Sequence, residues 1–254
     1  MSAISHSAIE QERIADLIRL LPRGRGSILD VGARDGRITQ LLPRHFREVT
    51  ALDLERPAWE SPGIRTVAGN ACNLDFPDAS FDCVLCSEVI EHIPAVEQAC
   101  RELARVARHE VVIGVPFRQD LRLGQMRCRS CGKLSPPYGH VNRFDERRLA
   151  DLFPDLVAVQ HSYVGETREA TNHLAVWLAR LAGNPDGPYD QQEPCIHCGA
   201  RLVRPEPLGL TARLTRKAGV VIERVQSSWT PPRARWIHAV FSRRSRAAAP
   251  TAIG

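Results

Sequence analysis

The nine residues Ile-Leu-Asp-Val-Gly-Ala-Arg-Asp-Gly at positions 28–36 constrain the fold of this chain more than any other feature. Apolar residues lead into Asp30. Gly32 and Gly36 then bracket a tight turn, and a helical pattern follows over 36–42. A strand, a tight turn and a helix N-terminus in this order expose bare backbone to a ligand. We therefore expect a nucleotide-like ligand to bind at this turn.

Apolar runs suited to buried strands alternate with helical patterns in the first half of the chain. The expected strands are 27–31, 48–54, 63–68, 81–86 and 110–115, and the expected helices include 7–21 and 94–107. Farther along, we expect a helix near 145–152 and strands near 156–163 and 171–181. Strands that alternate with helices predict a mostly parallel sheet with helices on both faces.

The positive charge of the chain is concentrated near its C-terminal end. The net charge is +5, yet residues 201–254 contain eleven Arg or Lys and two Glu, so the remaining residues are slightly acidic overall. Such a segment is typical either of a solvated tail or of one that binds nucleic acid or anionic lipid. Trp229, Trp236 and Phe241 could also form an amphipathic segment that docks on a membrane surface or on a partner protein.

The sequence contains no apolar run long enough to span a bilayer. Its N-terminus also lacks the basic and then apolar pattern of a secretory leader. We therefore expect a cytoplasmic protein without a transmembrane segment.

Four of the eight cysteines form two pairs with the spacing Cys-x-x-Cys-Gly: Cys128 with Cys131, and Cys195 with Cys198. In a cytoplasmic chain this spacing favours metal ligands over disulfides. Two such turns predict a closed, structural Zn²⁺ site with four cysteine ligands. Cys83 and Cys86 have the same spacing, but they lie in an expected strand and would point to opposite faces of it, so we interpret them as core residues.

Asp53 ends the second expected strand, where a carboxylate can accept hydrogen bonds from a ribose. The loop spacing Asp30-x-Gly32-x-Arg34-x-Gly36 differs from the Gly-x-Gly-x-x-Gly of a dinucleotide site. Three further segments complete a pattern: Gly69-Asn70-Ala71, Phe76-Pro77-Asp78-Ala79-Ser80-Phe81-Asp82 and Ser87-Glu88-Val89-Ile90-Glu91-His92-Ile93. With these motifs the chain resembles the class I S-adenosylmethionine-dependent methyltransferases over roughly residues 25–182.

The resemblance implies a Rossmann-like, seven-stranded, mostly parallel sheet that binds S-adenosylmethionine. The residues it implies as cofactor contacts are Asp30, Gly32, Ala33, Gly36, Asp53, Leu54, Asn70, Ala71 and Ser87. Two positions depart from the family pattern. Arg34 replaces the middle glycine of the loop, so it must adopt an ordinary conformation or be strained. Asn70 replaces the usual Asp but can still accept one hydrogen bond and donate another.

The segment after the fourth expected strand carries three chemically active side chains: Glu88, Glu91 and His92. On one helical turn they would share a face, and His140 could join them from a later loop. The set resembles the metal-binding residues of small-RNA 2′-O-methyltransferases, and quinone-pathway O-methyltransferases carry a similar segment. Three alternatives stay open: a second metal ion such as Mg²⁺ on these four residues, catalysis by His92 with Glu88, and a packing role alone.

We expect three parts in this chain. Residues 1–182 would form the methyltransferase domain, with an insert at 117–140 that carries the first cysteine pair. A linker and the second pair would occupy 183–204, and a basic tail 205–254. Because such inserts often recognise the substrate in this family, the zinc module would form a wall of the acceptor pocket.

The resemblance implies methyl transfer from S-adenosylmethionine to the oxygen of a small-molecule, sugar or glycan-pathway acceptor. One alternative is an RNA 2′-O-methyltransferase, which the basic tail and the Glu/Glu/His/His set favour, although phosphate binding requires positive charge around the cleft. Another alternative is a non-catalytic scaffold in which Arg34 blocks the cofactor.

Overall fold

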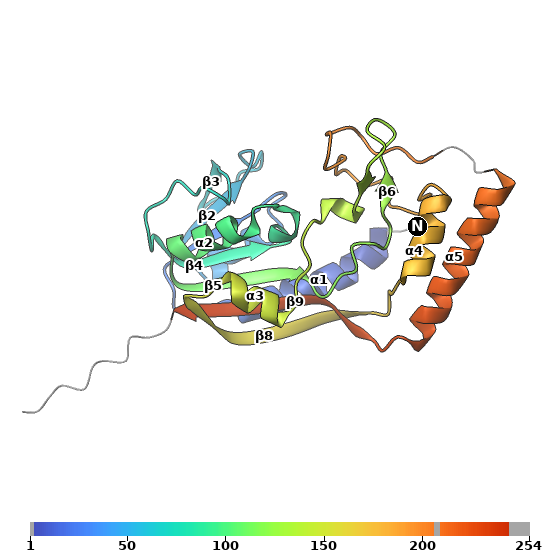
Figure 1. Cartoon of the computed structure of the whole chain (residues 1–254). Coiled ribbons are helices and arrows are strands. Elements are labelled where there is room, and N and C mark those ends of the chain that lie inside the picture. The colour runs from blue at the N-terminus through green and yellow to red at the C-terminus, as the bar shows by residue number, and fades with distance from the viewer. Residues whose placement is uncertain (1–2, 206–208, 244–254) are drawn as a thin grey trace, which may run out of the picture.

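The computed structural model describes residues 3–205 and 209–243 of the chain (Figure 1). Its centre is a seven-stranded sheet in the order β3-β2-β1-β4-β5-β9-β8. The strands are β1 (Ser27–Val31), β2 (Glu48–Asp53), β3 (Ile64–Ala68), β4 (Phe81–Ser87), β5 (Ala107–Pro116), β8 (Leu156–Thr167) and β9 (Arg233–Arg243). Strands β1 to β5 run parallel, and β9 runs antiparallel to both β5 and β8. The predicted Rossmann-like, mostly parallel sheet is confirmed.

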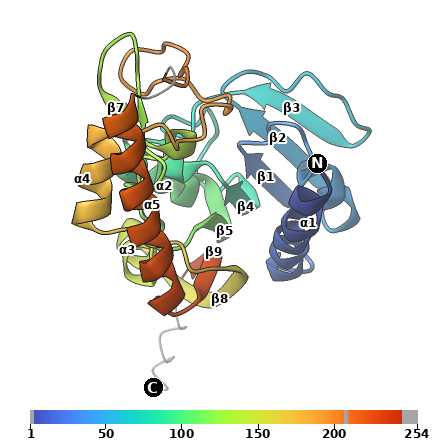
Figure 2. The same cartoon turned by 90° about the vertical axis from the view of Figure 1, so that its right-hand side faces the viewer.

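Helices cover both faces of the sheet, as Figure 2 shows. They are α1 (Ala3–Leu20) and the 3₁₀ helix η1 (Thr39–Arg44) on one face, and α2 (Val96–Val106) and α3 (Glu146–Leu152) on the other. In β4, Cys83 and Leu85 pack under α1, whereas Val84 and Cys86 pack under α2. The interpretation of Cys83 and Cys86 as core residues on opposite faces is therefore confirmed. Because β4 is buried on both faces, its sequence reads as a continuous apolar run.

Two local predictions are wrong. The turn after β1 leads into the short η1 rather than into a helix over 36–42. Residues 171–181 form a helix, α4 (His173–Leu181), rather than a strand, and Asn172 caps it by accepting the backbone N–H of Ala175 at 3.0 Å. Short apolar runs of this length fit either structure, and here the cap and the spacing of Leu174, Trp177 and Leu181 favour the helix.

The expected basic tail contributes to the sheet. Helix α5 (Leu210–Trp229) is followed by β9, which lies between β5 and β8 and buries Ile237 and Phe241. The division at residue 182 therefore separates two parts of one sheet, and a membrane-docking role for Phe241 is wrong because its side chain is in the core. Residues 206–208 and 244–254 of the expected tail lie outside the described residues.

The insert forms a small module beside the sheet. It contains β6 (Met126–Arg127), β7 (Leu134–Ser135) and the 3₁₀ helix η3 (Pro137–Gly139). Helices α4 and α5 pack against each other and form an arm at one end of the molecule (Figure 1). Within residues 3–205 and 209–243, we find no helix with the length and apolar character needed to cross a bilayer.

Candidate active site and four-cysteine centre

The loop after β1 packs tightly against the segment that follows β4. Gly32 has a φ of +83°, and its backbone N–H donates to the carbonyl oxygen of Leu52 at 2.7 Å. A Cβ atom on Gly32 would lie 2.1 Å from Cγ2 of Val89. Glycine is therefore required at position 32 both by the backbone conformation and by the close approach.

Arg34 adopts the strained alternative of the two that the sequence left open, with a φ of +43°. Its backbone N–H donates to Oδ2 of Asp53 at 2.8 Å, and the N–H of Leu54 donates to Oδ1 at 2.7 Å. The Arg34 side chain is 70% exposed and reaches the linker, at 3.3 Å from Gln192 and 3.5 Å from Glu193. Arg34 thus joins the loop that would hold the cofactor to the segment before the second cysteine pair.

A cleft of about 660 Å³ opens beside this loop. Four of the expected cofactor contacts line it: Asp30, Gly32, Ala33 and Ser87. Asp30 is buried and accepts a hydrogen bond from Oγ1 of Thr39 at 2.6 Å, and burial raises the pKa of Asp30 to about 6. The volume suits a cofactor-sized ligand.

The other expected cofactor contacts lie along the carboxyl ends of β1 to β3. The indole of Trp59 packs against Gly36 and donates to the carbonyl oxygen of Arg34 at 2.8 Å. Leu54 is 73% exposed, and Oδ1 of Asn70 accepts the backbone N–H of Cys72 at 2.9 Å. Ala71 is buried. Asn70 therefore uses its acceptor to shape its own turn, which leaves its side-chain N–H groups for a ligand.

A second cleft, of about 570 Å³, adjoins the first. The two share six residues: Glu10, Arg34, Glu88, Tyr138, Gln191 and Glu193. The second cleft is also lined by Phe117 and Gln119 from the insert, by Pro188 and Asp190 from the linker, and by Arg233 and Trp236 from β9. Both segments tied to the cysteine pairs therefore contribute walls to this cleft.

Glu88 lies at the junction of the two clefts, directly after β4. Its Oε2 accepts a hydrogen bond from Nε1 of Trp236 at 3.2 Å, and its Oε1 is buried without a partner among the described residues. Burial raises the pKa of Glu88 to about 7, and the positive charge of Arg13 acts in the opposite direction. Glu88 can therefore exchange a proton near neutral pH.

Glu88, Glu91 and His92 do not share one helical face as predicted, because Glu88 has a φ of +58° and η2 (Ile90–His92) is a single 3₁₀ turn. The structure instead brings Glu91, His92 and His140 together, with one potential ligand atom of each within 4.8 Å of the others. Nδ1 of His140 lies 2.6 Å from Oε1 of Gln119. If that nitrogen carries the proton, Nε2 of His140 keeps a free lone pair.

Glu91 has an unusual environment for a carboxyl group. Its side chain is fully buried, and both of its oxygens lack a hydrogen-bond partner among the described residues. Burial and the nearby Glu88 raise the pKa of Glu91 well above its ordinary value. Burial also lowers the pKa of His92, and it lowers that of His140 to about 4. An unpartnered carboxyl beside two neutral imidazoles fits a divalent ion bound by nitrogen and oxygen.

The four predicted cysteines converge although 63 residues separate the two pairs. Sγ of Cys128 lies 3.7 Å from Sγ of Cys198, and Sγ of Cys131 lies 3.7 Å from Sγ of Cys195. A tetrahedral ion with metal–sulfur bonds of about 2.3 Å separates its sulfur ligands by about 3.8 Å. The cysteine geometry therefore fits Zn²⁺.

Each cysteine pair forms the same backbone turn. Gly132 donates to the carbonyl of Cys128 at 2.9 Å, and Gly199 donates to the carbonyl of Cys195 at 2.9 Å. His197 lies between two cysteines in the sequence, but its Nε2 is 3.0 Å from the carbonyl oxygen of Leu134, and it is not among the clustered potential ligands.

Arg13 and Trp236 are among the site residues that the sequence prediction missed. Arg13 of α1 is buried, and its Nη1 donates to Oγ of Ser87 at 2.7 Å. Trp236 of β9 donates to Glu88. Arg13 could have been noticed in the sequence, because it is a charged residue within the apolar pattern of the first helix. The contact of Trp236 with Glu88 could not, because it depends on the position of β9 in the sheet.

Comparisons with known proteins agree with this geometry. Residues 29–113 match the family model described as a methyltransferase domain. The uncharacterized methyltransferase YcgJ of Bacillus subtilis is 30% identical over an alignment of 98 residues, which covers 35% of this chain and 39% of YcgJ. A probable S-adenosylmethionine-dependent methyltransferase of Mycobacterium tuberculosis is 33% identical over 96 residues, 35% of each chain. This chain spans less than half the length of the curated relatives it matches.

Solved structures show the same fold over nearly the whole chain. The crystal structure of YcgJ aligns with 92% of this chain and 98% of its own, with a TM-score of 0.54 and 14% identity. A putative methyltransferase from Bacillus halodurans C-125 aligns with 91% and 98%, with a TM-score of 0.57 and 11% identity. The class I methyltransferase fold therefore extends beyond the part of the sequence that matches.

Proposed function

We propose that this chain, whose residues 29–113 match the model of a methyltransferase domain, transfers a methyl group from S-adenosylmethionine to an oxygen of a small-molecule, sugar or glycan-pathway acceptor. The junction of the two clefts at Glu88 is the observation that carries this proposal. The first cleft borders the loop of the family's cofactor site, and the second gives an acceptor access to the same point. Holding the two reactants in line can supply much of the rate.

In this proposal the cofactor is held by the backbone of 30–36 and by Asp53. S-adenosylmethionine supplies an electrophilic methyl group on its sulfonium. Asp53 retains free lone pairs for the ribose after accepting the two backbone N–H groups, because each carboxylate oxygen can accept more than one hydrogen bond. The bridge from Arg34 to Glu193 holds this loop against the linker.

The lining of the second cleft supports an uncharged, polar acceptor. Five carboxyl groups line it: Glu10, Glu88, Glu169, Asp190 and Glu193. They outnumber the arginines, which are Arg34, Arg233 and Arg235. Carboxylates and the amide of Gln119 suit hydroxyl groups, and aromatic side chains add apolar surface of the kind a sugar ring covers. An RNA acceptor is less well supported, because phosphates favour a positively charged cleft.

Calorimetry with S-adenosylmethionine, followed by transfer of labelled methyl groups to metabolite and RNA fractions, tests the proposal. We expect cofactor binding and label in a polar small-molecule fraction. Label in RNA would favour the alternative acceptor, and the absence of binding at millimolar cofactor would favour a scaffold without catalytic activity.

Glu88 is the proposed base that removes the proton of the acceptor hydroxyl. Because only the ionised carboxylate accepts a proton, and its pKa is raised to about 7, the rate of methyl transfer should rise with pH through about 7. Glu88→Gln should lower the rate by roughly 10²–10⁴-fold and remove this pH dependence. His92→Gln serves as the comparison. If His92 were the base, His92→Gln would lose the pH dependence. The rate of methyl transfer by the parent would then rise with pH below pH 6.5, because the pKa of His92 is lowered.

A second candidate, metal-assisted methyl transfer, is favoured by the unpartnered carboxyl of Glu91. Glu91, His92 and His140 would hold the ion, and Gln119 would orient His140. Imidazole ligands favour a transition ion over Mg²⁺. Such an ion would lower the pKa of a bound hydroxyl group. Glu88 is outside this ligand set and would keep its role as base.

Glu91→Gln tests the metal site by two measurements. A raised folded-state pKa means that ionising Glu91 opposes folding as pH rises above the ordinary carboxyl value. Without metal, the variant should therefore be more stable than the parent at pH 8, and this difference should vanish toward pH 4. Its affinity for Zn²⁺ or Mn²⁺ at this site should fall more than 100-fold, above the 10–100-fold typical of outer-shell changes. A parent protein that binds no ion beyond the cysteine site would contradict the metal proposal.

A further inference from the structure

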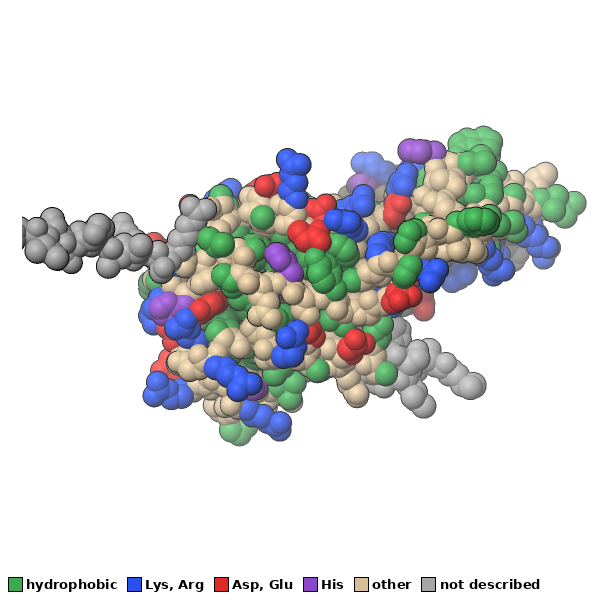
Figure 3. Space-filling model, turned by 90° about the horizontal axis from the view of Figure 1, so that it is seen from below, with side chains coloured by type: hydrophobic (Ala, Val, Ile, Leu, Met, Phe, Trp, Pro, Cys, Tyr) green, Lys and Arg blue, Asp and Glu red, His purple; other side chains and the backbone are tan. Residues whose placement is uncertain are grey.

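Helices α4 and α5 expose more large apolar side chains than any other part of the described chain. On α4 these are Leu174 (53% exposed), Trp177 (53%) and Leu181 (58%). On α5 they are Leu210 (74%), Leu214 (59%), Val221 (58%), Val225 (55%) and Trp229 (86%). Figure 3 shows hydrophobic side chains gathered with Lys and Arg at this end of the molecule. Contiguous exposed apolar surface of this kind marks an interaction site.

The apolar residues of α5 form one stripe along the helix. At about 100° per residue, all five fall within about 100° of one another around the helix axis. Gly219 lies on the opposite side, where a Cβ would be 3.4 Å from Cβ of Leu178 on α4. Helix α5 therefore uses one face to pack on α4 and leaves the apolar face uncovered by described residues.

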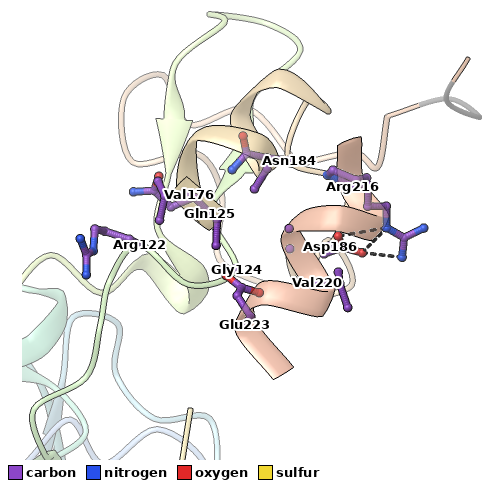
Figure 4. A pocket seen from close by; sticks show the side chains of 14 residues that line it. Arg122, Gly124, Gln125, Val176, Asn184, Asp186, Arg216, Val220 and Glu223 are labelled. Atoms are coloured by element: carbon purple, nitrogen blue, oxygen red, sulfur yellow. Dashed lines mark hydrogen bonds and ion pairs between the residues drawn. The ribbon is translucent and has the colours of Figure 1, made fainter. Parts of the chain in front are cut away.

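The arm is a preformed surface rather than a loose segment. Asp186 forms an ion pair with Arg216 through both of its oxygens (Figure 4). Oγ1 of Thr171 donates to Glu223 at 2.7 Å, and Nδ2 of Asn172 donates to Gln226 at 2.6 Å. These contacts fix α5 against α4 and against the linker.

The charges beside the stripe have one sign. Arg213, Lys217 and Arg224 flank the apolar residues on α5, and none of them forms an ion pair with another described residue. The nearby acidic groups, Asp186 of the linker and Glu223 of α5, are both engaged by the contacts that fix α5. The uncovered face therefore combines apolar and cationic groups, and its complement is an apolar, anionic surface.

We propose that the α4–α5 arm docks on the interfacial region of an anionic lipid bilayer. The apolar stripe would enter the boundary between headgroups and acyl chains, the three basic residues would bind anionic headgroups, and Trp229 would sit at the headgroup level. A second copy of this chain fits less well, because pairing the stripes of two copies would bring their basic residues close together.

Sedimentation of the full-length protein with vesicles tests the proposal. Vesicles of phosphatidylcholine and phosphatidylglycerol in equal parts should bind the protein, vesicles of phosphatidylcholine alone should bind it far more weakly, and added salt should weaken binding. Lys217→Glu with Arg224→Glu should reduce partitioning by about 30-fold or more, since each basic residue near an anionic surface contributes about fivefold. Leu214→Ser with Val221→Ser and Trp229→Ser should abolish it.

A matched control is Val157→Ser with Val159→Ser, which changes exposed apolar residues on β8, 40% and 59% exposed, away from the arm. This control should bind vesicles like the parent, and circular dichroism should show that all variants are folded. Equal binding to both vesicle types, or equal binding by the arm variants and the control, would overturn the proposal. A doubling of molecular mass in solution that the arm variants reverse would assign the surface to self-association instead.

Discussion

Gly32→Ala is expected to lower the free energy of unfolding by about 3 kcal/mol and to abolish binding of S-adenosylmethionine. A left-handed conformation costs a non-glycine residue about 1 kcal/mol or more, and overpacking adds about 1–3 kcal/mol. The new Cβ would lie 2.1 Å from Cγ2 of Val89, which is β-branched and cannot turn away freely. Relief of this clash would move the loop or the segment 87–92, and both border the proposed cofactor cleft.

Gly63→Ala is the matched control for this variant. Gly63 has a φ of +78°, close to the +83° of Gly32, but a Cβ there would meet no atom within 4 Å. Denaturant unfolding of Gly63→Ala should show a loss of about 1 kcal/mol, and calorimetry should show unchanged cofactor affinity. If the two variants lost equal stability, or if Gly32→Ala bound the cofactor normally, the close packing of this loop would have no role in cofactor binding.

Cys195→Ser is expected to remove one zinc ion per chain and to unfold the module that contains the cysteines. The module buries few other large apolar groups, chiefly Met126, Tyr189 and Leu202, so the ion must supply much of its stability. Structural zinc contributes on the order of 10–16 kcal/mol in zinc-finger peptides. Metal analysis and limited proteolysis in residues 183–204 measure the two effects.

Cofactor binding should largely survive Cys195→Ser, because the loop 30–36 and Asp53 belong to the sheet and not to the module. Methyl transfer should be lost, since the insert and the linker line the second cleft. Cys72→Ser, a half-buried thiol outside the module, should leave zinc content and protease resistance unchanged. A parent protein that contains no zinc and resists proteolysis equally after chelator treatment would contradict the assignment of the four cysteines.

The first five strands could be predicted from the sequence nearly to the residue. Four of them, β1, β2, β4 and β5, are largely buried, so their apolar runs are nearly continuous and their ends are marked by polar residues or turns. The cysteine site could also be predicted, because two Cys-x-x-Cys-Gly turns have few other uses in a chain of this kind. These features depend on local sequence.

The features that could not be predicted depend on contacts between distant residues. The strand β9 carries three arginines, and its place between β5 and β8 is set by pairing partners far away in the sequence. Helix α4 has an apolar run that also fits a strand. At the proposed site, the positive φ of Glu88 interrupts the helical turn on which Glu88, Glu91 and His92 would share one face, and the spacing i, i+3, i+4 contains no sign of this interruption.

The position of β9 has a consequence for how the protein assembles on the ribosome. The strand is the last of the seven to be synthesised, yet it must be in place before β8 can join the sheet. Until residue 243 has left the exit tunnel, β5 presents an open edge, and β8 lacks the strand with which it pairs. Loss of β9 would therefore leave an aggregation-prone half-sheet rather than a shorter folded protein.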